Sequence, residues 1–152
     1  MDDLRVLADI PKMLPGSPMP AILCDEHQLH LAFLLSDTSD DDDPTDACAI
    51  VTFRSCRRHT LGGLSDETFG LHPLAKNGLK IYAAMEVVNS SWISALKTEQ
   101  DALYPNKPMQ IENLRHFILT FHDSCFECLA MDYAVMVMRA NNPAQALWSV
   151  SL

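Results

Sequence analysis

Apolar and polar side chains alternate from His116 to His122, a pattern typical of a β-strand. Because successive side chains on a strand point to opposite faces, Phe117, Leu119 and Phe121 share one apolar face. The opposite face is mixed and consists of His116, Ile118, Thr120 and His122. This segment therefore predicts a sheet strand with one apolar face and one mixed face.

Three earlier segments have the apolar, β-branched composition of strands. Ala21–Cys24 and Leu29–Leu35 flank a polar turn of four residues, and Ala47–Phe53 is expected to lie antiparallel to the second of them. Leu79–Val88 is a fourth candidate. Because short turns rather than helical crossovers join consecutive strands, we expect antiparallel pairing.

Helical patterns are few. Leu4, Leu7 and Ala8 predict a short helix within residues 1–13. The clearest helix covers about 91–103, with Asn89 or Ser90 as its N-cap. One helical turn is expected over 72–78, and a final short helix is expected after Asn142-Pro143.

Residues 125–138 fit two interpretations. In a hairpin, pairing Phe121 with Phe126 brings apolar side chains together on one face. In a helix, Ser124 and Glu127 would form a capping box. The β-type composition of Tyr133–Val137 favours the strand.

These segments together predict an α+β fold, with a mainly antiparallel sheet of about five or six strands and two or three helices packed on it. A chain of 152 residues that is 48% apolar forms one domain, residues 1–152. Prolines keep residues 1–19 as an N-terminal Pro-rich lead-in. Residues 36–47 are acidic and nearly free of apolar side chains, so we expect a mobile loop there.

The chain is acidic, with 11 basic and 20 acidic residues and a net charge of −9. Six aspartates between residues 37 and 46 supply most of the excess. This charge repels phosphates and anionic lipids, so we expect no nucleic acid and no membrane as partner. No apolar run reaches the roughly 18 residues of a membrane span. A basic partner is more compatible with the charge.

Five cysteines and an N-terminus without a signal peptide predict a cytoplasmic protein with free thiols. Cys125 and Cys128 have the spacing of a thiol-relay motif, but Glu127 between them would oppose thiolate formation. A second Cys-x-x-Cys pair for zinc is missing, as are the phosphate-binding and hydrolase motifs. We therefore expect a structural role for these cysteines, no metal and no cofactor.

Ionisable side chains gather near the strand at 116–122. The candidates for acid–base catalysis are His122, Asp123, Glu86 and His72, and the candidates for binding are His116, Ser124 and Glu127. Asp66 and Glu67 are further residues that could join His122. Because His116 and His122 lie about 20 Å apart along one strand, they cannot share one metal ion. The alternative is that residues 122–124 form a turn whose side chains bond only to local amides.

Several short segments carry a resemblance. They are Leu71-His72-Pro73-Leu74, Glu86-Val87, Ser91-Trp92-Ile93, Leu114-Arg115-His116-Phe117 and Phe121-His122-Asp123-Ser124-Cys125-Phe126-Glu127-Cys128. With them, residues 20–130 resemble a small family of uncharacterised bacterial proteins. The resemblance implies a self-standing bacterial domain, from which the acidic segment 37–46 departs, and it transfers no catalytic role.

Three functional hypotheses follow. The first is a small acidic binding protein that takes a protein or small-molecule partner, for example an inhibitor of a basic partner. The second is an acid–base or metal-assisted hydrolase that uses His122 and Asp123 with Glu86 and His72. The third is a homodimer formed through an exposed strand or the methionine-rich segment 131–138. The sequence leaves open whether the protein is an enzyme.

Overall fold

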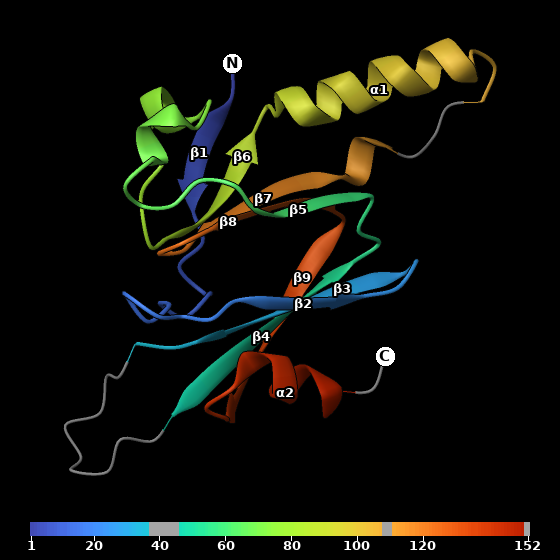
Figure 1. The fold of residues 1–152 in the computed structure, drawn as a ribbon. Coiled ribbons are helices and arrows are strands. Elements are labelled where there is room, and N and C mark those ends of the chain that lie inside the picture. Colours follow the sequence, from blue (N-terminus) through green and yellow to red (C-terminus); the bar gives the residue numbers. More distant parts are fainter. Residues whose placement is uncertain (37–45, 108–110, 151–152) are drawn as a thin grey trace.

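The computed structural model describes residues 1–36, 46–107 and 111–150. In this part of the chain, two antiparallel sheets pack face to face and carry their helical segments on the outer faces (Figure 1). One sheet has five strands in the order β1-β6-β7-β8-β5, and the other has four in the order β2-β3-β4-β9. The protein is therefore a β-sandwich with helical additions.

The element bounds are as follows. The five-stranded sheet contains β1 (Asp3–Val6), β6 (Ala84–Val88), β7 (Arg115–Thr120), β8 (Cys125–Ala130) and β5 (Arg58–Gly62). The four-stranded sheet contains β2 (Ala21–Cys24), β3 (Gln28–Leu34), β4 (Ala47–Arg54) and β9 (Asp132–Arg139). The helices are α1 (Ser91–Leu103) and α2 (Pro143–Trp148), and the 3-10 turns are η1 (Phe69–Leu71), η2 (Ala75–Asn77) and η3 (Ile111–Asn113).

Phenylalanine rings from both sheets fill the space between them. The ring of Phe33 in β3 lies 5.3 Å from that of Phe121, which follows β7. Phe53 in β4 lies 5.4 Å from both Phe117 and Phe126. All five rings are buried, so the apolar face expected for residues 117, 119 and 121 faces the core.

Besides the connection from β1 to β2, the chain passes from one sheet to the other at two neighbouring places. One crossing joins β4 to β5, and the other joins β8 to β9. The two crossings are hydrogen-bonded to each other, because Arg57 N–H donates to the Leu129 carbonyl and Met131 N–H donates to the Arg54 carbonyl. Consecutive strands therefore belong to different sheets at this corner of the sandwich.

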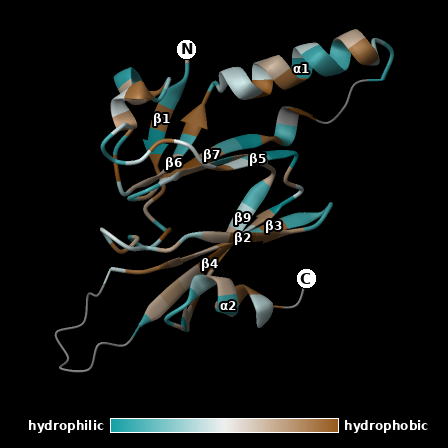
Figure 2. Ribbon diagram, viewed as in Figure 1, coloured by the Kyte–Doolittle hydropathy of each residue, from teal (hydrophilic) through white to brown (hydrophobic). Residues whose placement is uncertain are grey.

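Helix α1 lies over the outer face of the five-stranded sheet, with hydrophilic and hydrophobic bands along its length (Figure 2). None of its residues is buried. Its first turn contacts the sheet through Trp92, whose ring stacks on His116 with centroids 4.6 Å apart. The helix thus contributes little to the core and holds its N-terminus above His116.

Several local expectations are confirmed. Strands β2, β3 and β4 pair antiparallel as predicted, and residues 125–130 and 132–139 are strands rather than a helix. Helix α1 covers the predicted residues, and the Ser90 side chain caps it by accepting the N–H groups of Trp92 and Ile93. Helix α2 begins at Pro143 as expected.

Other expectations need correction. A sheet of five or six strands was expected, whereas nine strands form two sheets in the described part of the chain. Residues 3–6 form an edge strand that pairs with β6, so the helix predicted within 1–13 is wrong. Strand β5 was not predicted. Leu119, not Phe121, lies opposite Phe126, because the turn closes between Phe121 and Ser124.

Within the Pro-rich lead-in, Leu7, Ile10 and Met13 belong to the core. Of the predicted mobile loop 36–47, residues 37–45 lie outside the described residues. Among the helices of the described segments, none combines the length and apolar character that a bilayer crossing requires.

Candidate functional site

The outer face of the β7–β8 hairpin carries the first group of candidate residues. Phe117 and Phe126 face the core, so the alternating residues His116 and Glu127 point to the opposite, outer face. Glu127 pairs in register with Ile118, two residues beyond His116. Glu127 therefore lies diagonally across from His116 on the neighbouring strand, which places the His116 imidazole within reach of the Glu127 carboxylate.

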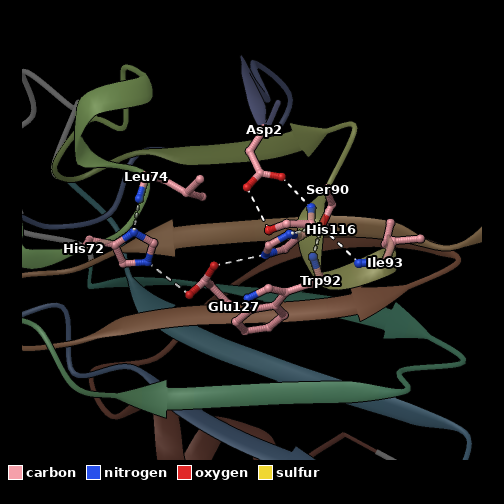
Figure 3. Close-up of polar contacts among 9 residues, drawn as sticks. Asp2, His72, Leu74, Ser90, Trp92, Ile93, His116 and Glu127 are labelled. Carbon is pink, nitrogen blue, oxygen red and sulfur yellow. Dashed lines mark hydrogen bonds and ion pairs between the residues drawn. The ribbon is translucent and has the colours of Figure 1, made fainter. Parts of the chain in front are cut away.

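Four side chains form a buried polar network, which consists of His72, Ser90, His116 and Glu127 (Figure 3). His116 Nε2 lies 3.0 Å from Glu127 Oε1, and His72 Nε2 lies 3.1 Å from Glu127 Oε2. At the other end, Ser90 Oγ lies 2.7 Å from His116 Nδ1. The network thus links the loop after η1, the sheet and the N-terminus of α1.

The backbone fixes the proton positions in this network. Leu74 N–H donates to His72 Nδ1 at 3.0 Å, so the His72 proton must be on Nε2, where it is donated to Glu127. Ser90 Oγ already accepts two backbone N–H groups, so its hydroxyl donates to His116 Nδ1 and His116 Nε2–H donates to the carboxylate. Glu127 is therefore an ionised acceptor between two imidazole donors.

The electrostatics agree with this assignment. Burial raises the pKa of Glu127, but the hydrogen bonds from His116 and His72 outweigh it and leave the pKa below its ordinary value. Ser90, His116 and Glu127 follow the serine–histidine–acid order of a hydrolase triad. However, Ser90 and His116 are only 4% and 2% exposed, and Ser90 is committed to capping α1. The network therefore holds elements together and is not accessible to a substrate.

Part of this network is also a possible metal site, because ligand atoms of His72, Cys125 and Glu127 lie within 4.8 Å of one another. Their chemistry does not fit a metal ion. A metal at His72 Nε2 would need the proton on Nδ1, which already accepts the Leu74 N–H. Burial and the charge of Glu127 raise the pKa of the Cys125 thiol to about 12, which disfavours the thiolate ligand. We assign no metal to these residues.

A second group, the Asp66–Tyr82–His122 cluster, lies nearer the surface. His122 Nδ1 is 2.8 Å from Asp66 Oδ2 and 3.1 Å from the Tyr82 hydroxyl oxygen. The Tyr82 hydroxyl donates to the same Asp66 oxygen. The backbone helps to align the pair, because Asp66 N–H donates to the His122 carbonyl at 2.9 Å.

This geometry is compatible with acid–base chemistry. With Nδ1–H donated to Asp66, Nε2 of His122 carries the lone pair, and the side chain is 38% exposed. The hydrogen bond from Tyr82 lowers the pKa of Asp66, and the same bond raises the pKa of Tyr82. Asp123 is 87% exposed, with its Oδ1 3.8 Å from His122 Nε2, so it belongs to the edge of the cluster.

Glu86 belongs to neither group. It pairs in register with Phe117 and therefore points to the inner face of the sheet, opposite to Glu127. Its carboxylate bonds to Arg5 and Arg115, and the hydrogen bonds from Arg115 hold its pKa below the ordinary value. This arrangement explains how β6 accommodates a buried carboxylate among apolar residues.

A cleft of about 450 Å³ lies beside the second group. It runs between the segment after β1 and the segment before β6, and Tyr82 is among its lining residues. The walls are mostly apolar, including the half-exposed Val6 and Ile81, and two exposed lysines, Lys12 and Lys80, also line it. The cleft therefore combines apolar surface with positive charge.

The sequence-predicted residues thus fall into three separate clusters. His72, His116 and Glu127 share the buried network, His122 meets Asp66 with Asp123 at the edge, and Glu86 pairs with arginines. Ser124 contributes its carbonyl to the β7–β8 turn. Tyr82, Ser90 and the two cleft lysines were missed as site residues. Only Ser90 had a signal in the sequence, as a helix cap.

Comparison of the chain with known proteins does not assign a family. No family model, no curated protein and no solved structure matches it. The resemblance to an uncharacterised bacterial family and its implications therefore stay predictions.

Proposed function

We propose that this protein is a small binding protein whose cleft takes an amphipathic organic anion. The occupant has an apolar body, which covers Val6 and Ile81, and a carboxylate or similar group, which lies between Lys12 and Lys80. The observation that carries the proposal is the pairing of apolar walls with two lysines in a cleft of about 450 Å³.

Size and charge both support this occupant. Clefts of roughly 300–1,000 Å³ with apolar walls and few polar groups are typical of small-molecule sites. Val6 and Ile81 are 50% and 45% exposed, so a ligand would remove apolar surface from water. The positive charges of Lys12 and Lys80 favour an anion at the cleft, and at this short range they act against the repulsion from a chain whose net charge is −9.

Titration with two ligands of equal chain length tests the proposal. We expect decanoate, below its micellar concentration, to bind at one site, and decyltrimethylammonium to bind at least tenfold more weakly. Calorimetry gives the affinities, and amide NMR shifts report the location. The largest shifts are expected at Val6, Ile81 and Tyr82.

Lysine variants provide the matched comparison. Lys80→Met and Lys12→Met keep the apolar stem and remove the charge, so each should weaken decanoate binding by about threefold. Lys97→Met, on exposed α1, should leave the affinity unchanged. Equal affinity for the anion and the cation, or no binding of either, would contradict the proposal.

Acid–base catalysis is a second candidate, favoured by the Asp66–His122 hydrogen bond and the free Nε2 of His122. If it holds, His122→Asn should abolish hydrolysis of an activated ester such as p-nitrophenyl acetate above the buffer rate. The control is His59→Asn, which removes an exposed histidine from β5. Equal rates for the wild type and His122→Asn would exclude a catalytic role in this reaction.

The remaining hypotheses stay predictions. Most of the acidic segment that suggested a basic partner lies outside the described residues, so an inhibitory interaction stays a prediction. The same holds for a homodimer and for a cytoplasmic location.

A further inference from the structure

Two cysteines meet at the corner where the chain crosses between the sheets. Cys56 lies in the short connection between β4 and β5, and Cys128 lies in β8. The hydrogen bonds from Arg57 N to Leu129 O and from Met131 N to Arg54 O clamp this connection against the end of β8. The Cys56 thiol donates to the Arg58 carbonyl at 3.5 Å. Each of the two thiols also shifts the pKa of the other, so their side chains lie close together.

The sequence spacing suggests Cys125 as the partner of Cys128, but the structure separates these two side chains. Cys125 and Cys128 are three residues apart on one strand, so their side chains point to opposite faces. Cys125 packs under the 3-10 turns on the outer face, whereas Cys128 belongs to the core between the sheets. Cys56 packs against that same core, to which Cys128 belongs.

We propose that Cys56 and Cys128 form an oxidation site, at which a peroxide converts the two thiols into an intramolecular disulfide. Cys56 is the attacking residue because it is partly exposed, whereas Cys128 is fully buried.

The hydrogen bond from Cys128 lowers the pKa of Cys56, and burial raises the pKa of Cys128 far above its ordinary value. The two thiols are therefore unequal, as an attacking and a resolving cysteine must be.

The reaction takes two steps. The Cys56 thiolate attacks one oxygen of hydrogen peroxide, the O–O bond breaks, and the products are a sulfenic acid and hydroxide, which is protonated to water. The Cys128 sulfur then attacks the Cys56 sulfur, and the S–O bond breaks. The departing hydroxide takes the Cys128 proton and leaves as a second water. Peroxide is reduced, and both sulfurs are oxidised.

Peptide mapping of the whole folded protein tests this inference. Reduced protein is treated with hydrogen peroxide, the remaining thiols are alkylated, and the digest is analysed without reduction. We expect a linked pair of peptides containing Cys56 and Cys128, with a mass loss of two hydrogens that dithiothreitol reverses. Cys24, Cys48 and Cys125 should be recovered alkylated.

Two variants at partly or fully exposed positions make the test specific. Cys56→Ser should abolish the link and leave Cys128 reduced, whereas Cys24→Ser should form the link as the wild type does. A link between Cys125 and Cys128, or the absence of a Cys56–Cys128 link in protein that circular dichroism shows to be folded, would overturn the proposal.

Discussion

Replacing Glu127 with glutamine changes one acceptor atom in the buried polar network and keeps its shape. The carboxylate accepts His116 Nε2–H and His72 Nε2–H through different oxygens. In Glu127→Gln, one of these oxygens becomes an NH₂ group that faces an N–H donor. Neither imidazole can move its proton to Nδ1 easily, because Leu74 N–H occupies one Nδ1 and the Ser90 hydroxyl occupies the other.

The free energy of unfolding should therefore fall. Leaving a buried donor unsatisfied costs about 1–3 kcal/mol, and the remaining bond loses its charge assistance. Relief of the carboxylate's desolvation offsets part of this loss, so we expect a net destabilisation of about 2–3 kcal/mol. For a chain of this size, that corresponds to a fall in Tm of roughly 5–10 °C.

Urea unfolding at pH 7, followed by circular dichroism, measures the effect. The midpoint should fall while the m-value stays the same, since the fold is retained. Glu67→Gln, at an exposed position near Asp66, is the matched control and should change stability by less than about 0.5 kcal/mol. If Glu127→Gln were as stable as this control, the proton assignment in the network would be refuted.

Three further outcomes are expected. The pKa of Glu127 is lower in the folded state than its ordinary value of 4.5. Its contribution to the free energy of unfolding is therefore fully present above pH 4.5 and is lost as the pH falls through the folded-state pKa. The difference between the midpoints of wild type and Glu127→Gln should therefore shrink in urea titrations as the pH is lowered below 4.5. Leu147→Ala should cost about 2–4 kcal/mol in urea unfolding because Leu147 anchors α2 on the four-stranded sheet, whereas Trp148→Ala, 80% exposed, should cost almost nothing. Ser90→Ala should cost about 1–2 kcal/mol by the same assay, since it removes the cap of α1, while Ser94→Ala inside the helix should be neutral.

Local patterns in this sequence predicted local structure well. Alternation identified the inner face of β7, and a short polar turn identified the β2–β3 hairpin. The register of the β7–β8 hairpin was predicted two residues off. A shift of two residues keeps every side chain on its face, so alternation alone cannot detect it.

Long-range pairing was not visible in the same way. Strand β1 has a weak local pattern and exists because it pairs with β6 at the sheet edge. Strand β5 is polar and lies at the opposite edge. Two of the crossings between the sheets occur after Arg54 and Ala130, where nothing in the local composition separates a crossing from an ordinary turn.

The candidate sites also depend on long-range pairing that local sequence patterns do not reveal. His122 was predicted to need a partner from another element, and Asp66 was one of the residues named for it. Glu86 was grouped with His122 only because both are ionisable. Its position on the inner face follows from its register with Phe117, which requires knowledge of the partner strand.

The strand order also bears on how fast this chain reaches its native state. Asp3 in β1 pairs with Val88 in β6, and Arg54 bonds to Asp132, which is 78 residues later. Chains dominated by such distant contacts fold over milliseconds to seconds, because large loops must close before pairing stabilises them. During synthesis, β1 and one edge of β4 therefore stay unpaired until β6 and β9 have left the ribosome. In this period the exposed strand edges are most prone to aggregation, and chaperone binding protects the chain most.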